Sequence, residues 1–135
     1  MEPIKVVARF MDGRVVKGYT QDFYPNRPYF HLHKEITRPS GDHPIRVEIK
    51  DLKAVFFVKT FEGKKEYNER KKFIEGDRPQ GRKVVVTFVD GETIQGSTIG
   101  YDPQRPGFFL MPIDPESNNI RIFVVLAAVR NFRFL

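Results

Sequence analysis

Two arginines recur in the same short motif and are the side chains best placed for binding chemistry. Arg27 lies in Pro25-Asn26-Arg27-Pro28, and Arg105 lies in Pro103-Gln104-Arg105-Pro106. The flanking prolines restrict the backbone, so each guanidinium is preorganised to bind a phosphate or a carboxylate through paired hydrogen bonds. The alternative interpretation is that the prolines shape a turn and the arginine only covers it.

Other titratable residues do not combine into a catalytic or metal-binding pattern. His31 and His33 stand two positions apart and would share one face of a strand, but no third metal ligand accompanies them. Asp12 and Asp90 recur because each begins an Asp-Gly turn, and no second titratable group recurs beside them as general acid–base catalysis requires. We therefore predict no enzymatic activity, no cofactor and no metal site.

The elements that carry these residues form an internal repeat. The segment Lys5–Gly13 is closely similar to the segment Lys83–Gly91. The same spacing relates further identical pairs: Gly18 and Gly96, Thr20 and Thr98, Pro25 and Pro103, Arg27 and Arg105, Pro28 and Pro106, Phe30 and Phe108, and Leu32 and Leu110. After a loop, the copies align again where Leu52 matches Leu126, with the second loop four residues shorter. The chain is thus predicted to contain two copies of one unit.

Each copy has the pattern of a small curled sheet. An alternating apolar segment ends at Asp-Gly, which predicts a hairpin with a type I′ turn. The strand that follows contains Gly18 or Gly96, which is typical of a bulge or a bend. We expect five short strands in residues 1–59 and five in residues 81–135, with each set closing into a small β-barrel.

Residues 60–80 differ from the repeats and join them. Gly63 and Gly76 flank a charged segment, rich in good helix formers, that carries Tyr67, Lys71 and Ile74 along one helical face. The segment is predicted to be a helical linker. The expected fold class is therefore all-β with a short helical linker.

The first copy also resembles a known family. Val6-x-x-Arg9-Phe10-x-Asp12-Gly13-Arg14-x-x-x-Gly18, followed by Asp22-Phe23-x-Pro25-Asn26 and Phe30-x-Leu32, resembles the first conserved motif of Sm and Sm-like proteins. The resemblance implies a bent five-stranded barrel, with an architecture close to SH3-like barrels, that often assembles edge to edge into rings binding single-stranded RNA. The tandem arrangement is similar to that of an uncharacterised bacterial protein family.

The sequence also departs from the Sm pattern. The second Sm motif normally contains Arg-Gly, whereas the corresponding segments here are Ile49-Lys50-Asp51-Leu52 and Val124-Val125-Leu126-Ala127. In the second copy, Gly100 and Gln104 replace the Asp and Asn of the first motif. These losses weaken the inference of a uridine pocket and leave the inference about the fold intact.

Composition restricts the possible partners. The chain has 135 residues, no cysteine and a net charge of +6, and basic side chains exceed acidic ones most clearly in residues 1–59. A polyanion should therefore prefer the first copy. No apolar run is long enough to span a bilayer or to form a signal peptide, so we expect a cytoplasmic protein without a membrane partner.

Two functional hypotheses follow from these observations. The first is a non-catalytic interaction or regulatory module that recognises a protein partner or a second copy of itself. The second is single-stranded RNA binding by the first copy. The candidate ligand-binding residues are Arg14, Asn26, Arg27, Tyr29 and Arg105.

The second copy suggests where the repeats meet. Residues 122–129 and 108–111 are apolar on both faces, so some surface must cover the outer one. We expect this face to pack within a monomer against the first copy or the linker, with a homodimer as the alternative.

Overall fold

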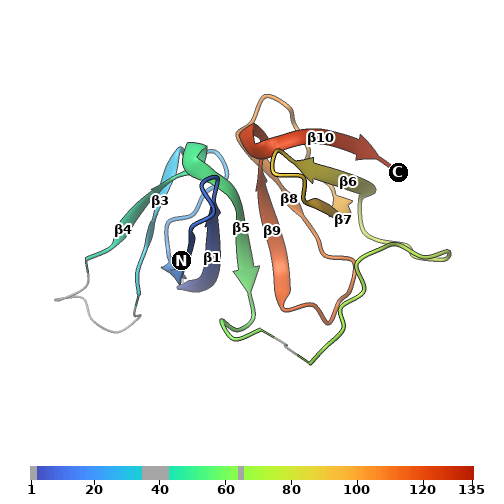
Figure 1. Ribbon diagram of the computed structural model, residues 1–135, viewed down its shortest axis with the longest axis horizontal. Helices are drawn as coiled ribbons and strands as arrows, with labels where there is room; N and C mark the ends of the chain where they lie inside the picture. Colours follow the sequence, from blue (N-terminus) through green and yellow to red (C-terminus); the bar gives the residue numbers. More distant parts are fainter. Residues whose placement is uncertain (1–2, 35–42, 64–65) are drawn as a thin grey trace.

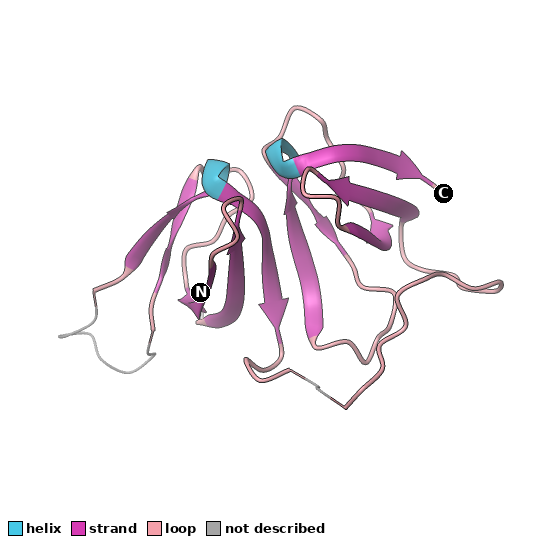
Figure 2. Ribbon diagram, viewed as in Figure 1, coloured by secondary structure: helices cyan, strands magenta, loops and turns pink. Residues whose placement is uncertain are grey.

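The computed structural model describes residues 3–34, 43–63 and 66–135, and over these residues the chain is mostly β with no α-helix (Figures 1 and 2). The first half contains β1 (Ile4–Phe10), β2 (Val15–Thr20), β3 (Tyr29–Leu32), β4 (Ile45–Glu48) and β5 (Leu52–Val58). The second half contains β6 (Arg82–Phe88), β7 (Thr93–Thr98), β8 (Gly107–Leu110), β9 (Asn119–Val125) and β10 (Val129–Phe134). A single 3₁₀ turn precedes the last strand of each half, η1 (Ile49–Asp51) and η2 (Leu126–Ala128).

The two Asp-Gly turns are hairpins in equivalent strand contexts, but they are not type I′. Gly13 and Gly91 each have φ of +94°, and no other residue type has positive φ in the described chain. The Gly13 N–H donates to Phe10 O at 3.0 Å, and the Phe10 N–H donates to Arg14 O at 2.9 Å. This pattern fits a three-residue hairpin loop that ends in one left-handed glycine, because a type I′ turn would also require positive φ at Asp12.

The glycine inside the second strand of each half permits a close backbone approach. A Cβ on Gly18 would lie 2.8 Å from His33 O, and a Cβ on Gly96 would lie 2.4 Å from Met111 O. The register between β1 and β2 passes through Gly18 without a shift, so the glycine does not mark a bulge there. It allows the third strand to cross closely over the second, which it contacts through single bridges.

The strands form three antiparallel sheets rather than two closed barrels. The sheet orders are β2-β1-β5-β9-β8, β10-β6-β7 and β3-β4. The bridges Tyr19–His33 and Ser97–Met111 connect β2 to β3 and β7 to β8. No closed barrel is present in the described strands, because β5 pairs with β9 of the other half instead of returning to β4. Figure 1 shows β5 and β9 side by side at the centre of the molecule.

The structural alignment of the two halves differs from the sequence alignment after the variable loop. Phe10 pairs with Leu52 in the first half, and its counterpart Phe88 pairs with Val129 in the second. Leu52 is therefore equivalent to Val129 and not to Leu126, and the second loop is one residue shorter rather than four. The prediction was wrong because apolar residues on both faces of this segment allow several registers to match.

The linker is not helical over its described residues, 60–63 and 66–80. Its backbone N–H groups are bound by side chains instead: Arg70 N–H donates to Asp114 Oδ2 at 3.1 Å, and Ile74 N–H donates to Asp77 Oδ2 at 2.8 Å. Because these carboxylates take the donors that an α-helix would use, the good helix formers of this segment do not form one. No helix in the described residues is long and apolar enough to cross a membrane.

The two hydrophobic cores exchange residues across the central strand pair. Phe123 and Val125 of β9 belong to the core of the first half, and Phe109 packs against it. In return, Ala54 of β5 lies in the core of the second half, with Phe56 packed against it. The apolar outer face of the second repeat is thus covered within the chain by the first repeat.

Candidate functional site

The pairing of β5 with β9 creates a junction with side chains of both repeats on either face. The register runs from Ala54 opposite Val124 to Phe57 opposite Arg121. Alternate residues of a strand point to opposite faces, so each of these strands contributes to both cores. Most residues of the junction are consequently buried, whereas Arg121 lines two surface pockets.

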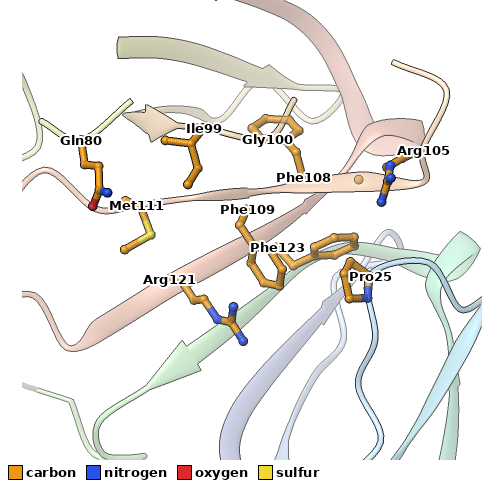
Figure 3. A pocket seen from close by; sticks show the side chains of 11 residues that line it. Pro25, Gln80, Ile99, Gly100, Arg105, Phe108, Phe109, Met111, Arg121 and Phe123 are labelled. Atoms are coloured by element: carbon orange, nitrogen blue, oxygen red, sulfur yellow. The ribbon is translucent and has the colours of Figure 1, made fainter. Parts of the chain in front are cut away.

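A pocket of about 410 Å³ opens beside this junction (Figure 3). Its walls are mainly apolar, and Pro25 of the first repeat forms part of one side. The lining residues are Pro25, Gln80, Ile99, Gly100, Arg105, Gly107, Phe108, Phe109, Met111, Arg121 and Phe123. Small-molecule sites have this size and composition, with few polar groups in a largely apolar cavity.

Arg121 is a charged side chain on β9, directly opposite Phe57 of β5 in the junction. Its Cζ lies 4.1 Å from the Phe109 ring centroid and 4.7 Å from that of Phe57. Partial burial lowers the pKa of Arg121, and no carboxylate of the described residues pairs with it. The guanidinium is therefore held in place by aromatic rings and keeps its hydrogen-bond donors available.

Arg105 lines the same pocket from its rim. Its Nε lies 3.6 Å from Asp102 Oδ2, and both side chains are about half exposed. The loop motif thus places a second cation among the residues that line the pocket, as Figure 3 shows. This is one of the residues selected from the sequence, and the pocket brings it close to residues that the sequence did not suggest.

The other selected residues lie on the first repeat and do not line this pocket. Arg14 pairs with Asp12 within its own turn at 2.8 Å. Arg27 stacks on the exposed ring of Tyr24, with 4.7 Å between Cζ and the centroid, and Asn26 is exposed in the same loop. Their partners are local, so the four first-repeat residues do not form one cluster with Arg105.

Tyr29 belongs to a separate aromatic and basic group on β3 and β4. Arg46 lies over the Tyr29 ring at 3.8 Å, and His31 meets that ring edge-on at 5.6 Å. His31 Nδ1 is 2.7 Å from Asp22 Oδ2, and the hydrogen bonds from His31 help to lower the pKa of Asp22 against the opposing effect of burial. His31 is thus engaged with a carboxylate, and no group of three potential metal ligands occurs among the described residues.

Asp90 has a structural role that its counterpart Asp12 lacks. The Lys53 ammonium of β5 donates to Asp90 Oδ2 at 2.7 Å and also to Glu92 Oε1. Burial opposes the charge of Lys53, but these two hydrogen bonds raise its pKa above the ordinary value. Asp90 therefore joins the second repeat to the first, which accounts for its position without any catalytic role.

The sequence contained only partial signals for the pocket. Phe109 and Phe123 lie in segments that are apolar on both faces, which indicated a covered surface. Arg121 gave no signal, because its significance depends on the position of β5, a strand distant in the sequence. In the structural alignment its counterpart in the first repeat is Pro44, so comparison of the copies offers no recurring arginine.

The chain matches the profile of a protein family. The profile of a family of unknown function, DUF6982, covers residues 2–135, nearly the whole chain. No curated protein and no solved structure matches the chain.

Proposed function

Since the chain belongs to family DUF6982, whose function is unknown, we propose a function from its geometry: a non-catalytic interaction module that binds its ligand between the two repeats. The observation that carries this proposal is the apolar pocket beside the β5–β9 junction. A cavity formed where two units meet is the usual place for a binding site, because both units contribute walls.

The charge distribution supports binding rather than catalysis. Arg105 and Arg121 are the cationic side chains in the pocket wall, and no carboxylate or histidine accompanies them there. General acid–base chemistry needs a group that changes protonation near neutral pH, whereas arginine stays charged. A stable cation in an apolar wall is suited to orienting a ligand.

We also propose that each repeat is an Sm-like or SH3-like small barrel left open at one edge. The order of strands within each repeat, with the fifth strand beside the first, supports this assignment. The pairing of β5 with β9 would then correspond, within one chain, to the edge-to-edge contact that Sm-like subunits make between chains. A crystal structure compared with Sm-like proteins tests the assignment, and a different strand order would overturn it.

Variants at the pocket rim test the proposed binding function. Ile99 lines the pocket and its side chain is 79% exposed, so Ile99→Asp should keep the fold and make the entrance polar. Ile74 in the linker is also exposed and lies outside the pocket, which makes Ile74→Asp a matched control. Each purified variant is incubated with native lysate, and the bound protein, RNA and small molecules are compared with those of the wild type.

The expected result is that Ile99→Asp loses a component that the wild type and Ile74→Asp both retain. Equal retention by all three proteins would overturn the pocket as the binding site.

A second candidate function is single-stranded RNA binding by the first repeat. The observation that favours it is the group formed by Tyr29, His31 and Arg46, because a base could stack on such rings while the arginine contacts phosphate. Arg46→Ala should then weaken RNA binding more than Arg105→Ala, and affinity should fall steeply with salt. No mobility shift with single-stranded RNA at low salt would exclude this function.

A further inference from the structure

The pocket beside the junction has a chemical feature that selects for one class of ligand. Its walls are aromatic and aliphatic, while Arg121 presents a cation that no described carboxylate neutralises. The side chain is partly withdrawn from water and rests on Phe57 and Phe109. A charge held in a partly apolar environment interacts more strongly with an incoming counter-ion than the same charge in water does.

The contacts of Arg121 are with aromatic rings rather than with acidic groups. Its Cζ lies 4.1 Å from the Phe109 centroid and 4.7 Å from the Phe57 centroid, and no described carboxylate pairs with it, so its N–H donors can bind a carboxylate or phosphate through two parallel hydrogen bonds. The apolar wall continues past Phe109 to Ile99 and Met111, which are exposed at the opening. An anion at Arg121 would thus have an apolar surface next to it.

The corresponding place in the first repeat lacks the arginine and two of the aromatic rings, since Pro44 stands at the position of Arg121. In the structural alignment, His31 replaces Phe109 and Arg46 replaces Phe123. The arrangement therefore exists only in the second repeat, whose fourth strand meets the first repeat. This argues for a site built by the junction rather than one inherited by both copies.

We propose that the pocket binds an organic anion with an apolar body, its acidic group paired with Arg121 and its chain or ring against Phe109, Ile99 and Met111. This inference rests on the proposed function, since it names the ligand class of the same pocket. Arg105 also lines the pocket, but Asp102 pairs with it at 3.6 Å, so Arg121 supplies the cation without an acidic partner. The ligand is either a free organic acid or the carboxyl terminus of a peptide with an apolar last residue.

Matched probes test the proposal by titration followed in ¹H–¹⁵N spectra at low ionic strength. Octanoate supplies the carboxylate and the apolar chain, octanol supplies the chain alone, and octyltrimethylammonium reverses the charge. We expect octanoate to bind most tightly, with shifts at the amides of Ile99, Phe109 and Arg121. An acetylated Leu-Phe dipeptide with a free or an amidated carboxyl terminus distinguishes the peptide source from the free acid.

Variants of Arg121 separate charge from packing. Arg121→Met keeps the contact with Phe57 and Phe109 but removes the charge, and it should weaken octanoate binding by about tenfold or more without changing octanol binding. Arg121→Lys keeps the charge but loses the paired hydrogen bonds, so its affinity for octanoate should lie between that of the wild type and that of Arg121→Met. The melting temperature of each variant checks that the fold is intact.

Three results would overturn the proposal. They are octanol binding as tightly as octanoate, unchanged octanoate affinity in Arg121→Met, or shifts confined to Lys5 and Tyr19, which line a second pocket together with Arg121. If octanoate fails while Ile99→Asp still loses a lysate component, the interaction module stands and only the ligand class is wrong. If Ile99→Asp loses nothing, the pocket itself is not the binding site.

Discussion

At the scale of residues, the same motif has acquired two different roles in the two repeats. Asp12 pairs with Arg14 inside its own turn. In the second repeat Glu92 stands where Arg14 stands in the first, and Asp90 and Glu92 both bind Lys53 of the other half. Where the first repeat has Arg14 and a local ion pair, the second has Glu92 and a contact between the repeats.

The Lys53 cluster predicts a definite order of stabilities. Replacing both acids, Asp90→Asn with Glu92→Gln, leaves the nearly buried Lys53 ammonium without an ionic partner, so this variant should have the lowest melting temperature. Lys53→Met should cost less, because the freed carboxylates are half exposed and can be hydrated. Asp12→Asn serves as the control and should change the melting temperature little. An equal effect of Asp12→Asn and the double variant, measured by calorimetry at pH 7, would contradict this assignment.

At the scale of elements, β8 can approach the junction only because it begins with glycine. A Cβ on Gly107 would lie 2.3 Å from Val124 O and 2.6 Å from Phe123 Cζ. The first repeat has Tyr29 at the position of Gly107. The strand paired with it, β4, has Arg46 where β9 has Phe123, so no phenylalanine ring crowds the tyrosine. Glycine at this position is therefore needed in the second repeat, whose fourth strand, β9, forms the junction, and not in the first.

Gly107→Ala should destabilise the protein by about 1–3 kcal/mol, because a methyl group there forces Phe123 or the β9 backbone to move. Gly100→Ala is the matched control, since a Cβ at Gly100 meets nothing within 4 Å. Urea unfolding of both variants measures the difference. Equal stability of the two would mean that Phe123 has room to move.

The linker makes a prediction about pH. Tyr67 Oη donates to Asp114 Oδ2 at 2.6 Å, which raises the pKa of Tyr67 to about 12 and lowers that of Asp114 to about 2. Because the pKa of Asp114 is lowered, its hydrogen bonds stabilise the folded linker fully above the ordinary aspartate pKa, and this stabilisation is lost as the pH falls towards 2. Because the pKa of Tyr67 is raised, its hydrogen bond stabilises the folded linker fully below pH 10, and this stabilisation is lost as the pH rises through about 12.

Exchange of the linker amides, or cleavage of the linker by protease after adjustment of pH, should follow these two limits. Tyr67→Phe should open the linker already at neutral pH and abolish the alkaline limit. A linker amide pattern identical in the wild type and Tyr67→Phe from pH 7 to pH 12 would show that this hydrogen bond does not hold the segment.

The elements also show what local sequence can and cannot determine. The hairpins at the two Asp-Gly sequences and the five strands of each half follow from local patterns, and the structure contains them, although the turn type differs. The linker helix was wrong because Asp114, more than 30 residues from the segment's end, supplies the competing acceptor. The pocket could not be predicted either, because it forms only where β5 pairs with β9. The sequence indicated only its aromatic residues, which lie in segments that are apolar on both faces.

At the scale of the whole molecule, the shared cores make the two repeats one folding unit. Phe123 is fully buried in the first core and meets Phe23 edge-on at 5.1 Å. Phe123→Ala should therefore cost about 3–5 kcal/mol. Both halves should still unfold in one transition, whether followed by near-ultraviolet circular dichroism or by amide signals assigned to each half. Two separate melting transitions would show that the repeats fold independently.

The outer strand β4 is poorly suited to pair with another chain in the way that β9 pairs with β5. Arg46 and Glu48 of β4 form an ion pair at 2.9 Å in the positions that Phe123 and Val125 occupy in β9. Charged side chains at an edge disfavour pairing with another chain. The wild type should therefore be monomeric by light scattering.

Arg46→Phe combined with Glu48→Val restores the apolar pattern of β9 on β4 and should increase the mass through association with β10 of another chain. A wild type that is already a stable dimer, or a variant that stays monomeric, would contradict the role assigned to this ion pair.

The pairing of β5 with β9 also has a consequence for synthesis of the chain. β5 ends at Val58, whereas the strand that covers its edge ends at Val125. A ribosome adding roughly 5–20 residues per second needs on the order of 10 s to produce the intervening residues. During that time the nascent first repeat displays an unpaired strand edge flanked by Phe56 and Phe57, which is the kind of surface that chaperones bind. Release of the chain before β9 has been translated would leave a fragment prone to aggregate.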